Sequence, residues 1–245
     1  MTTIQTGAVQ VLNGTLIIDA YLAEPAGDGP FPAVVVIQEV FGVNAHIRDV
    51  CDRLAQSGYI ALAPAIYQRN APGFEVAYDE AGLKEGRKYK DMTDADELLS
   101  DVEAAIAYLR ACPNVKPGGV GTLGFCFGGH VVYLAATLPE VKATASFYGA
   151  GITTMTPGAG EPPTLTRTRQ IGGALYGFFG RVDSLIPSGQ VDEIEAALKA
   201  NGLDHKVFRY DDAGHGFFCD GRSAYVEAAA KDAWIQVQEL FGRCL

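Results

Sequence analysis

The stretch Gly124-Phe125-Cys126-Phe127-Gly128-Gly129 decides how this chain is organised. Residues 120–123, Val-Gly-Thr-Leu, predict a short buried strand before it, and residues 131–136, Val-Val-Tyr-Leu-Ala-Ala, predict the apolar start of a helix after it. Glycines two positions before and two positions after Cys126 let the chain turn sharply between strand and helix. Such a turn exposes the side chain at its tip, where the G-x-S-x-G elbow holds its serine nucleophile. The sequence therefore predicts a thiol nucleophile at Cys126.

Length, composition and charge indicate a single globular domain. The chain has 245 residues, of which 48% are hydrophobic and 20% are charged, so residues 1–245 can form one α/β core. The net charge of −10 argues against nucleic acid as a partner, because nucleic acid binding needs a basic face. No apolar run approaches the ~18 residues that span a bilayer, and residues 1–5 lack the features of a signal peptide. We therefore expect no association with a membrane.

The cysteines number five, an odd count, and none lies in a C-x-x-C motif: Cys51, Cys112, Cys126, Cys219 and Cys244. They fit a reducing cytosol better than a disulfide framework or a zinc site. We therefore expect a cytoplasmic protein, a monomer or a weak dimer, with no metal and no cofactor. Cys51 and Cys112 lie in helical patterns, and we interpret them as filler of the core.

Strands alternate with helices along the chain, and no segment is repeated. Residues 9–12 and 15–22 predict an antiparallel pair joined at Asn13-Gly14, a dipeptide that favours hairpin turns. Further strands are expected at Ala33–Ile37, 60–63, 120–123, 143–148, 174–179 and 206–210, and helices at 47–57, 81–89, Ala95–Ala111, from 131 onward, 190–200 and 223–240. About eight strands with helical crossovers predict one mostly parallel, twisted sheet with helices on both faces. The long connection 149–172 is expected to cap the site.

A cysteine nucleophile needs a base, and the base needs an acid to orient it. His215 is the candidate base, because it stands in a glycine-flanked loop, Gly214-His215-Gly216, between the last predicted strand and the last predicted helix. The other three histidines lie at or beside predicted elements, and we interpret them as structural or solvated: His46, His130 and His205.

Asp183 is the candidate acid. It follows the apolar strand 174–179 and precedes residues that turn toward a helix. Asp211 and Asp212 lie nearer to His215 in the sequence, but stabilisation of the turn is the simpler role for both. The resulting order of nucleophile, acid and histidine is the order found in α/β-hydrolases.

Residues 119–124, Gly-Val-Gly-Thr-Leu-Gly, also satisfy the G-x-G-x-x-G pattern of dinucleotide-binding proteins. That motif works only where it follows a strand and opens a helix. Here the glycines lie within the predicted strand, and the helix begins only after Cys126. A nucleotide site is therefore disfavoured.

With these residues identified, the chain resembles the dienelactone hydrolase family (carboxymethylenebutenolidases) over nearly its full length. The matching segments are Gln38-Glu39-Val40-Phe41-Gly42, the elbow 124–129, Asp183 before Ile186-Pro187, and Gly214-His215-Gly216-Phe217. The resemblance implies an α/β-hydrolase fold and a Cys126–His215–Asp183 triad, with Glu39 as a fourth active-site residue. It also implies an oxyanion hole formed by the backbone N–H groups of Phe127 and Val40.

The resemblance further implies cofactor-independent hydrolysis of a small lactone or ester, such as dienelactone, which yields maleylacetate. The Cys126 thiolate would attack the carbonyl carbon, and water would then hydrolyse the acyl thioester. In the family, the counterpart of Glu39 interacts with the resting thiol and helps to deprotonate it. The alternative for Glu39 is a surface carboxylate at the end of a strand.

The family arginines that hold a substrate carboxylate have no clear match. After His215 there is no arginine until Arg222, and Glu85 stands four residues before Tyr89, the candidate match for the family's tyrosine. The substrate-binding candidates are therefore Arg69, Arg87, Tyr89 and Phe217, with Lys84 as a further basic replacement. Phe217, Phe218 and Phe74 predict a more apolar pocket, and hence only a weak preference for the acidic dienelactone.

The alternative from another class is a non-catalytic or redox-sensing binding protein on the same scaffold. In that case Cys126 would be oxidised reversibly, and Cys219, near His215 in the sequence, would resolve it as a disulfide. The presence of both an acid and a base favours catalysis, because a sensor would not need Asp183.

Overall fold

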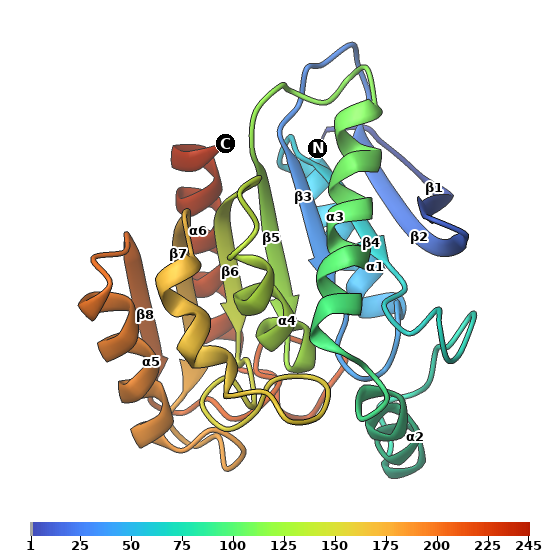
Figure 1. Cartoon of the computed structure of the whole chain (residues 1–245). Helices are drawn as coiled ribbons and strands as arrows, with labels where there is room; N and C mark the ends of the chain where they lie inside the picture. Colours follow the sequence, from blue (N-terminus) through green and yellow to red (C-terminus); the bar gives the residue numbers. More distant parts are fainter. Residues whose placement is uncertain (1) are drawn as a thin grey trace.

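Eight strands form one sheet in residues 2–245, the part of the chain that the computed structural model describes (Figure 1). The strands are β1 (Ile4–Asn13), β2 (Leu16–Pro25), β3 (Ala33–Ile37), β4 (Ile60–Pro64), β5 (Val120–Phe125), β6 (Val141–Phe147), β7 (Ala174–Gly180) and β8 (His205–Tyr210). The helices are α1 (Ala45–Gln56), α2 (Glu80–Lys90), α3 (Ala95–Ala111), α4 (Phe127–Ala135), the 3₁₀ helix η1 (Thr164–Gln170), α5 (Ser188–Ala200) and α6 (Glu227–Cys244).

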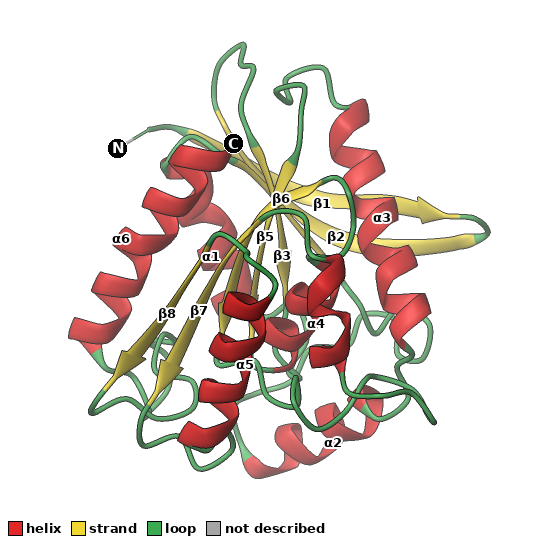
Figure 2. Cartoon of the chain, turned by 60° about the vertical axis from the view of Figure 1, so that its left-hand side comes forward, coloured by secondary structure: helices red, strands yellow, loops and turns green. Residues whose placement is uncertain are grey.

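The strand order is β1-β2-β4-β3-β5-β6-β7-β8. The hairpin β1–β2 lies at one edge, its turn contains Gly14 at φ +59°, and β2 pairs antiparallel with β4. All other pairs are parallel. Helices α1 and α6 cover one face of the twisted sheet, and α3, α4 and α5 cover the other (Figures 1 and 2). The predicted α/β-hydrolase fold is confirmed.

The central strands are buried along their whole length, which explains their composition. Every residue of β3, β5 and β7 is buried. Strands covered on both faces can be apolar throughout, as in the Ala-Val-Val-Val-Ile sequence of β3. The carboxyl ends of the parallel strands meet at one end of the sheet, the lower end in Figure 1. In open α/β sheets, ligands bind outside this end.

Several predicted elements have other bounds in the structure, and the largest difference is at β1, which begins at Ile4, five residues before the predicted start. Helix α6 begins at Glu227, four residues later than expected, because the preceding residues form turns in which Val226 N–H donates to Phe217 O (3.0 Å). Helix α4 begins at Phe127, earlier than its apolar run suggested. The connection 149–172, for which no helix was predicted, contains η1.

The cysteines of residues 2–245 are all free thiols. Cys51 is fully buried in the core, as predicted, whereas Cys112 is only half-buried beyond the end of α3. None of the helices in this part of the chain combines the length and the apolar character needed to cross a lipid bilayer.

Candidate active site

Cys126 occupies a strained turn between β5 and α4. Its backbone lies at φ +55° and ψ −118°, a region that side chains other than glycine rarely adopt. Glycines permit the close contacts around it: a Cβ on Gly124 would lie 2.2 Å from Gly128 O, and a Cβ on Gly128 would lie 2.4 Å from Ile37 O. The turn therefore packs directly against the end of β3, with the sulfur of Cys126 at its tip.

Asp183 and His215 form a hydrogen-bonded pair at the same end of the sheet. Asp183 follows β7 and is 4% exposed, and its Oδ2 atom lies 2.8 Å from Nδ1 of His215. Its other oxygen, Oδ1, accepts the backbone N–H of Leu185 at 2.8 Å. Because both carboxylate oxygens are engaged, Asp183 is held in a position that fixes the orientation of the His215 ring.

The free side of the His215 ring faces Cys126. Atom Nε2 has no hydrogen-bond partner in residues 2–245, and His215 and Cys126 line the same cavity. Burial lowers the pKa of His215, but the charge on Cys126 and the hydrogen bond to Asp183 outweigh burial and raise this pKa from 6.5 to about 10. The imidazole can therefore hold a proton beside a charged sulfur.

Glu39 is fully buried, so the alternative of a surface carboxylate is wrong. It lies beyond the end of β3, and its Oε2 atom accepts the hydroxyl of Tyr78 at 2.7 Å. Its Oε1 atom accepts Nη1 of Arg222 at 3.2 Å. The Arg222 guanidinium in turn lies over the rings of Phe41 (5.6 Å) and Tyr78 (5.0 Å). Glu39 is thus engaged by Tyr78 and Arg222, and it does not line the cavity.

Arg222 reaches the site because the chain folds back on itself after His215. Arg222 N–H donates to Cys219 O (3.1 Å), and Cys219 N–H donates to Gly216 O (3.1 Å), so two turns follow each other. Gly216 lies at φ +85°, and a Cβ there would be 2.6 Å from Nη1 of Arg222. Arg222 was not among the candidates chosen from the sequence, because it lies seven residues after His215. The signal that could have found it is Gly216, since a glycine next to the histidine favours a turn that brings the following residues back toward the site.

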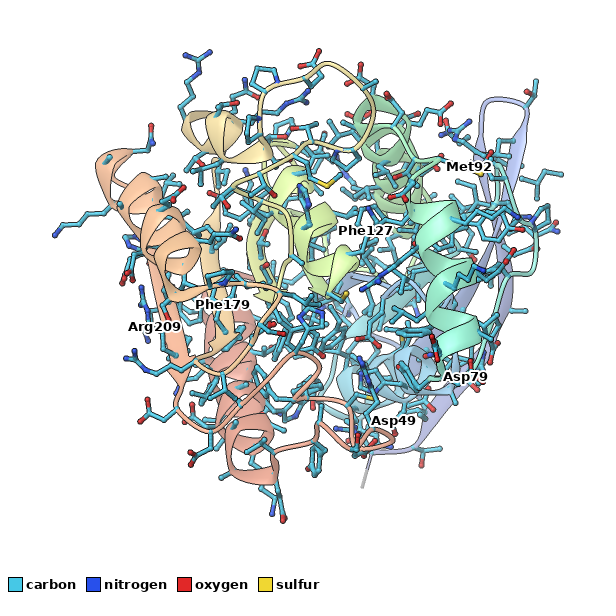
Figure 3. All side chains as sticks on the ribbon, turned by 90° about the horizontal axis from the view of Figure 1, so that it is seen from below. Asp49, Asp79, Met92, Phe127, Phe179 and Arg209 are labelled. Carbon is cyan, nitrogen blue, oxygen red and sulfur yellow. The ribbon has the colours of Figure 1, made fainter. Side chains whose placement is uncertain are left out.

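A cavity of about 470 Å³ opens above Cys126 at the carboxyl ends of the strands. Figure 3 looks onto this end of the molecule, with Phe127 near the middle of the view. The lining residues come from six separate segments: Val40, Phe41, Leu83, Arg87, Lys90, Cys126, Phe127, His130, Ala150, Gly151, Met155, Ser184, Leu185, His215 and Arg222. Three of them are lysine or arginine, and no carboxylate is among them. The cavity is therefore apolar over most of its wall. Of its three lysine and arginine side chains, Lys90 pairs with Asp91 and Arg222 with Glu39, whereas Arg87 has no carboxylate partner among the described residues.

Of the two arginine candidates, Arg87 lines the cavity and Arg69 does not. Arg87 is an exposed residue of α2 and makes no ion pair within the described part of the chain. Arg69, in the loop after β4, instead donates to Asp101 of α3 at 2.7 Å. A role for Arg69 in binding substrate is thus a prediction that the geometry contradicts, because a buried carboxylate already holds its charge.

The aromatic candidates also lie outside the cavity wall. Tyr89 packs edge-on against Phe74, with ring centroids 4.9 Å apart. Phe217 and Phe218 are buried in the core, where Phe217 packs against Tyr148 at 5.4 Å. The prediction that Phe217, Phe218 and Phe74 form the apolar wall of the pocket is therefore wrong. None of these rings lines the cavity, and they pack against other side chains instead.

Val40 and Phe127, whose backbone N–H groups are the predicted oxyanion hole, both line the cavity with Cys126. Phe127 is the first residue of α4, whose opening N–H groups have no partner inside the helix. Neither N–H donates to a protein acceptor anywhere in residues 2–245, and both residues line the cavity beside Cys126. Both N–H groups are therefore free to donate, and their role as an oxyanion hole stays a prediction.

Cys219 is fully buried and does not line the cavity. Burial raises the pKa of the Cys219 thiol, which keeps it protonated and unreactive. The arrangement gives no support to Cys219 as a resolving thiol. Among the described residues, no group of three or more His, Cys, Asp or Glu side chains is arranged to hold a metal ion.

A sequence model of the dienelactone hydrolase family matches residues 18–245. The chain belongs to this family. A Synechocystis protein named "Putative carboxymethylenebutenolidase" is 57% identical to this family member over 97% of its chain and 96% of the relative. The carboxymethylenebutenolidase of Pseudomonas putida is 32% identical over 86% and 85% of the two chains.

A solved structure has the same overall fold as this dienelactone hydrolase family member. The crystal structure of a "Putative Dienelactone Hydrolase" from Klebsiella pneumoniae superposes with a TM-score of 0.86 at 31% identity, covering 98% of this chain and 99% of the other. The resemblance predicted from the elbow, the acid and the histidine segment is confirmed, and the chain is a hydrolase of the dienelactone hydrolase type.

Proposed function

We propose that this enzyme hydrolyses small lactones or esters through a covalent thioester on Cys126. The observation that carries the proposal is the hydrogen-bonded pair of Asp183 and His215, in which Oδ2 and Nδ1 lie 2.8 Å apart. The free Nε2 atom of His215 faces Cys126 inside a cavity of about 470 Å³. A nucleophile, a base and a group that orients the base are the three parts that nucleophilic catalysis needs.

In the first half of the reaction, the Cys126 thiolate attacks the carbonyl carbon of the substrate. The proton of the thiol resides on His215, whose raised pKa favours the imidazolium. The carbonyl oxygen becomes an oxyanion within reach of the N–H groups of Val40 and Phe127, and the amino end of α4 adds a favourable dipole. Collapse then breaks the bond to the leaving oxygen, which takes the proton from Nε2.

In the second half, His215 accepts a proton from water, and the resulting hydroxide attacks the thioester carbon. The second tetrahedral intermediate expels the Cys126 thiolate and releases the carboxylic acid. A thiolate leaves more readily than an amide nitrogen does, so a tetrahedral adduct with an amide would revert to substrate. Lactones and esters with good leaving groups are therefore the proposed substrates, whereas amides are not.

The charge of the cavity indicates that the preferred substrate is anionic. The chain carries a net charge of −10, yet Arg87, Lys90 and Arg222 all line the cavity and no carboxylate does. Basic side chains that converge on a partly desolvated site favour an anionic ligand by charge-assisted hydrogen bonds. We propose a carboxylate-bearing lactone or ester, such as dienelactone, in place of the weak acid preference expected from the sequence.

The test is chemical trapping of the thioester. Wild-type protein mixed with p-nitrophenyl acetate and quenched with acid should give an acetylated peptide that contains Cys126, detected by mass spectrometry. Cys126→Ala should lose both the adduct and the esterase activity, while the matched control Cys112→Ala, a half-buried cysteine away from the cavity, should retain both. Wild-type turnover in Cys126→Ala would refute the covalent mechanism.

A further inference from the structure

One wall of the cavity belongs to the connection between β6 and β7. Ala150, Gly151 and Met155 line the cavity from this segment, which is irregular up to η1. An irregular backbone has many accessible conformations, so a wall built from it keeps one shape only where tertiary contacts fix it.

The side chain of His130 joins the first residue of this wall to the first residue of η1. Its Nδ1 atom lies 3.0 Å from Ala150 O, and its Nε2 atom lies 2.7 Å from Oγ1 of Thr164. Because a carbonyl oxygen only accepts, Nδ1 carries the hydrogen, and the Thr164 hydroxyl donates to Nε2. His130 is 0% exposed, so both bonds are shielded from water.

Thr164 extends the contact to Met155. The backbone N–H of Thr164 donates to Met155 O at 3.1 Å, and the neighbouring Thr156 hydroxyl donates to Pro162 O at 2.6 Å. The wall from residue 150 to residue 155 is therefore held by the His130 ring directly at Ala150 and through Thr164 at Met155.

His130 also belongs to the helix that carries the nucleophile turn. Its backbone N–H donates to Cys126 O at 3.2 Å in the first turn of α4. The ring thus joins the wall of the cavity to the turn that positions Cys126, although it takes no part in the Asp183–His215 pair.

We propose that His130 is a positioning residue that holds the wall of residues 150–155 at a fixed distance from Cys126 and thereby sets which substrates fit. The role rests on the proposed function, because it concerns the same cavity and the same reaction. It predicts an effect that grows with the size of the substrate, since a small ester makes little contact with the wall.

The test compares two esters on His130→Leu, a variant of similar shape that removes both hydrogen bonds. For p-nitrophenyl butyrate, the KM is expected to rise about 10-fold with kcat changed less than about 3-fold, as two buried polar groups lose their partner. For p-nitrophenyl acetate, which is the smaller ester, the rise in KM should be smaller, about 2- to 3-fold. His130→Asn, which keeps a donor near Nδ1, should recover part of the KM.

Tyr133→Phe is the matched control, because the Tyr133 hydroxyl joins the same helix to the same connection. It bonds Oγ1 of Thr168 at 2.7 Å, away from the cavity lining. Its loss should lower the Tm without changing the KM for either ester. Hydrogen–deuterium exchange should rise in residues 150–164 for His130→Leu, but not for Tyr133→Phe.

An unchanged KM for the butyrate in His130→Leu, or an equal rise in Tyr133→Phe, would overturn the proposal. So would unaltered exchange in residues 150–164. A wild-type protein that forms no thioester would overturn the proposed function instead, and the exchange comparison would still decide whether His130 fixes the wall.

Discussion

At the scale of single residues, the site consists of charged side chains that are largely buried and are held in place by hydrogen bonds. Asp183 is fixed by two hydrogen bonds, and His215 is fixed by Asp183 and remains free on the side of Cys126. Glu39 is separately paired with Arg222, whereas Nε2 of His215 has no hydrogen-bond partner in residues 2–245. The chemistry therefore depends on the electrostatic coupling between two side chains.

This coupling predicts a change in the titration of His215. Because folding raises the pKa of His215 to about 10, protonation of His215 stabilises the folded state. This stabilisation is complete below pH 6.5 and is lost as the pH rises through about 10. In Cys126→Ala, the charge that raises the pKa is removed while burial still lowers it, so the midpoint should fall by about 1–3 pH units. The Cε1–H resonance of His215 followed by NMR measures this midpoint; an unchanged midpoint would show that Cys126 does not carry the coupling.

Arg87 provides the test of substrate charge. Arg87→Met removes an exposed guanidinium that lines the cavity, and kcat/KM for the free dienelactone acid should fall about 10-fold. The methyl ester of the same acid should be affected less than about 2-fold, because it offers no carboxylate. Lys88→Met, on the same helix but paired with Glu85 at 3.1 Å, is the control and should change neither rate. Equal losses for acid and methyl ester would contradict the assignment.

At the scale of elements, the elbow works because α4 approaches the end of β3 without a side chain between them. This approach places Phe127 and Val40 in the wall of the same cavity. Helix α2 is packed in the same manner: a Cβ on Gly86 would lie 2.1 Å from Val40 O. The shared cavity wall of Val40 and Phe127 is thus a product of how three elements meet.

Gly128→Ala should disrupt this meeting. Its Cβ would lie 2.4 Å from both Ile37 O and Gln38 O, so the helix must shift away, at a cost of about 1–3 kcal/mol in unfolding free energy and a large loss of kcat. Gly189→Ala is the matched control: it is also the second residue of a helix, but its Cβ would have no neighbour within 4 Å. Urea unfolding and esterase assays on both variants make the comparison, and equal behaviour would show that the contact is not limiting.

At the scale of the whole molecule, buried neutral histidines link the fold to pH. Burial lowers the pKa of His130 from 6.5 to about 4, with a smaller contribution from Lys90, although the bond to Ala150 O opposes the change. Burial likewise lowers the pKa of His46, whose ring nitrogens have no partner in residues 2–245. Both histidines must therefore stay uncharged in the folded protein.

The expected consequence is a loss of stability in mild acid. An unfolded chain protonates His130 near pH 6.5, whereas the folded chain resists until about pH 4, so the stability is present above pH 6.5 and declines as the pH falls between these values. The decline from this residue is on the order of 3 kcal/mol. Urea unfolding of wild type and His130→Leu at pH 7 and pH 4.5 isolates it, because other groups cancel in the difference. Parallel pH profiles would contradict the buried neutral state.

The sequence by itself determined the sheet, the elbow and the acid–base pair. Apolar runs such as Ala33–Ile37 specify buried strands, and glycines around Cys126 specify a sharp turn, because these features act through neighbouring residues. The order of Cys126, Asp183 and His215 was also readable, since parallel strands bring their carboxyl ends to one edge.

Only the tertiary structure decided which side chains face the substrate. Arg222 enters the cavity through two consecutive turns, Arg69 is held by a distant carboxylate, and Phe217 is turned into the core. Each outcome depends on contacts between segments far apart in the chain. A small change in how a loop is oriented in these contacts decides whether one of its side chains is buried or faces the cavity. Local periodicity carries no information on such rotations, so the specificity of the pocket could not be predicted from the order of its residues.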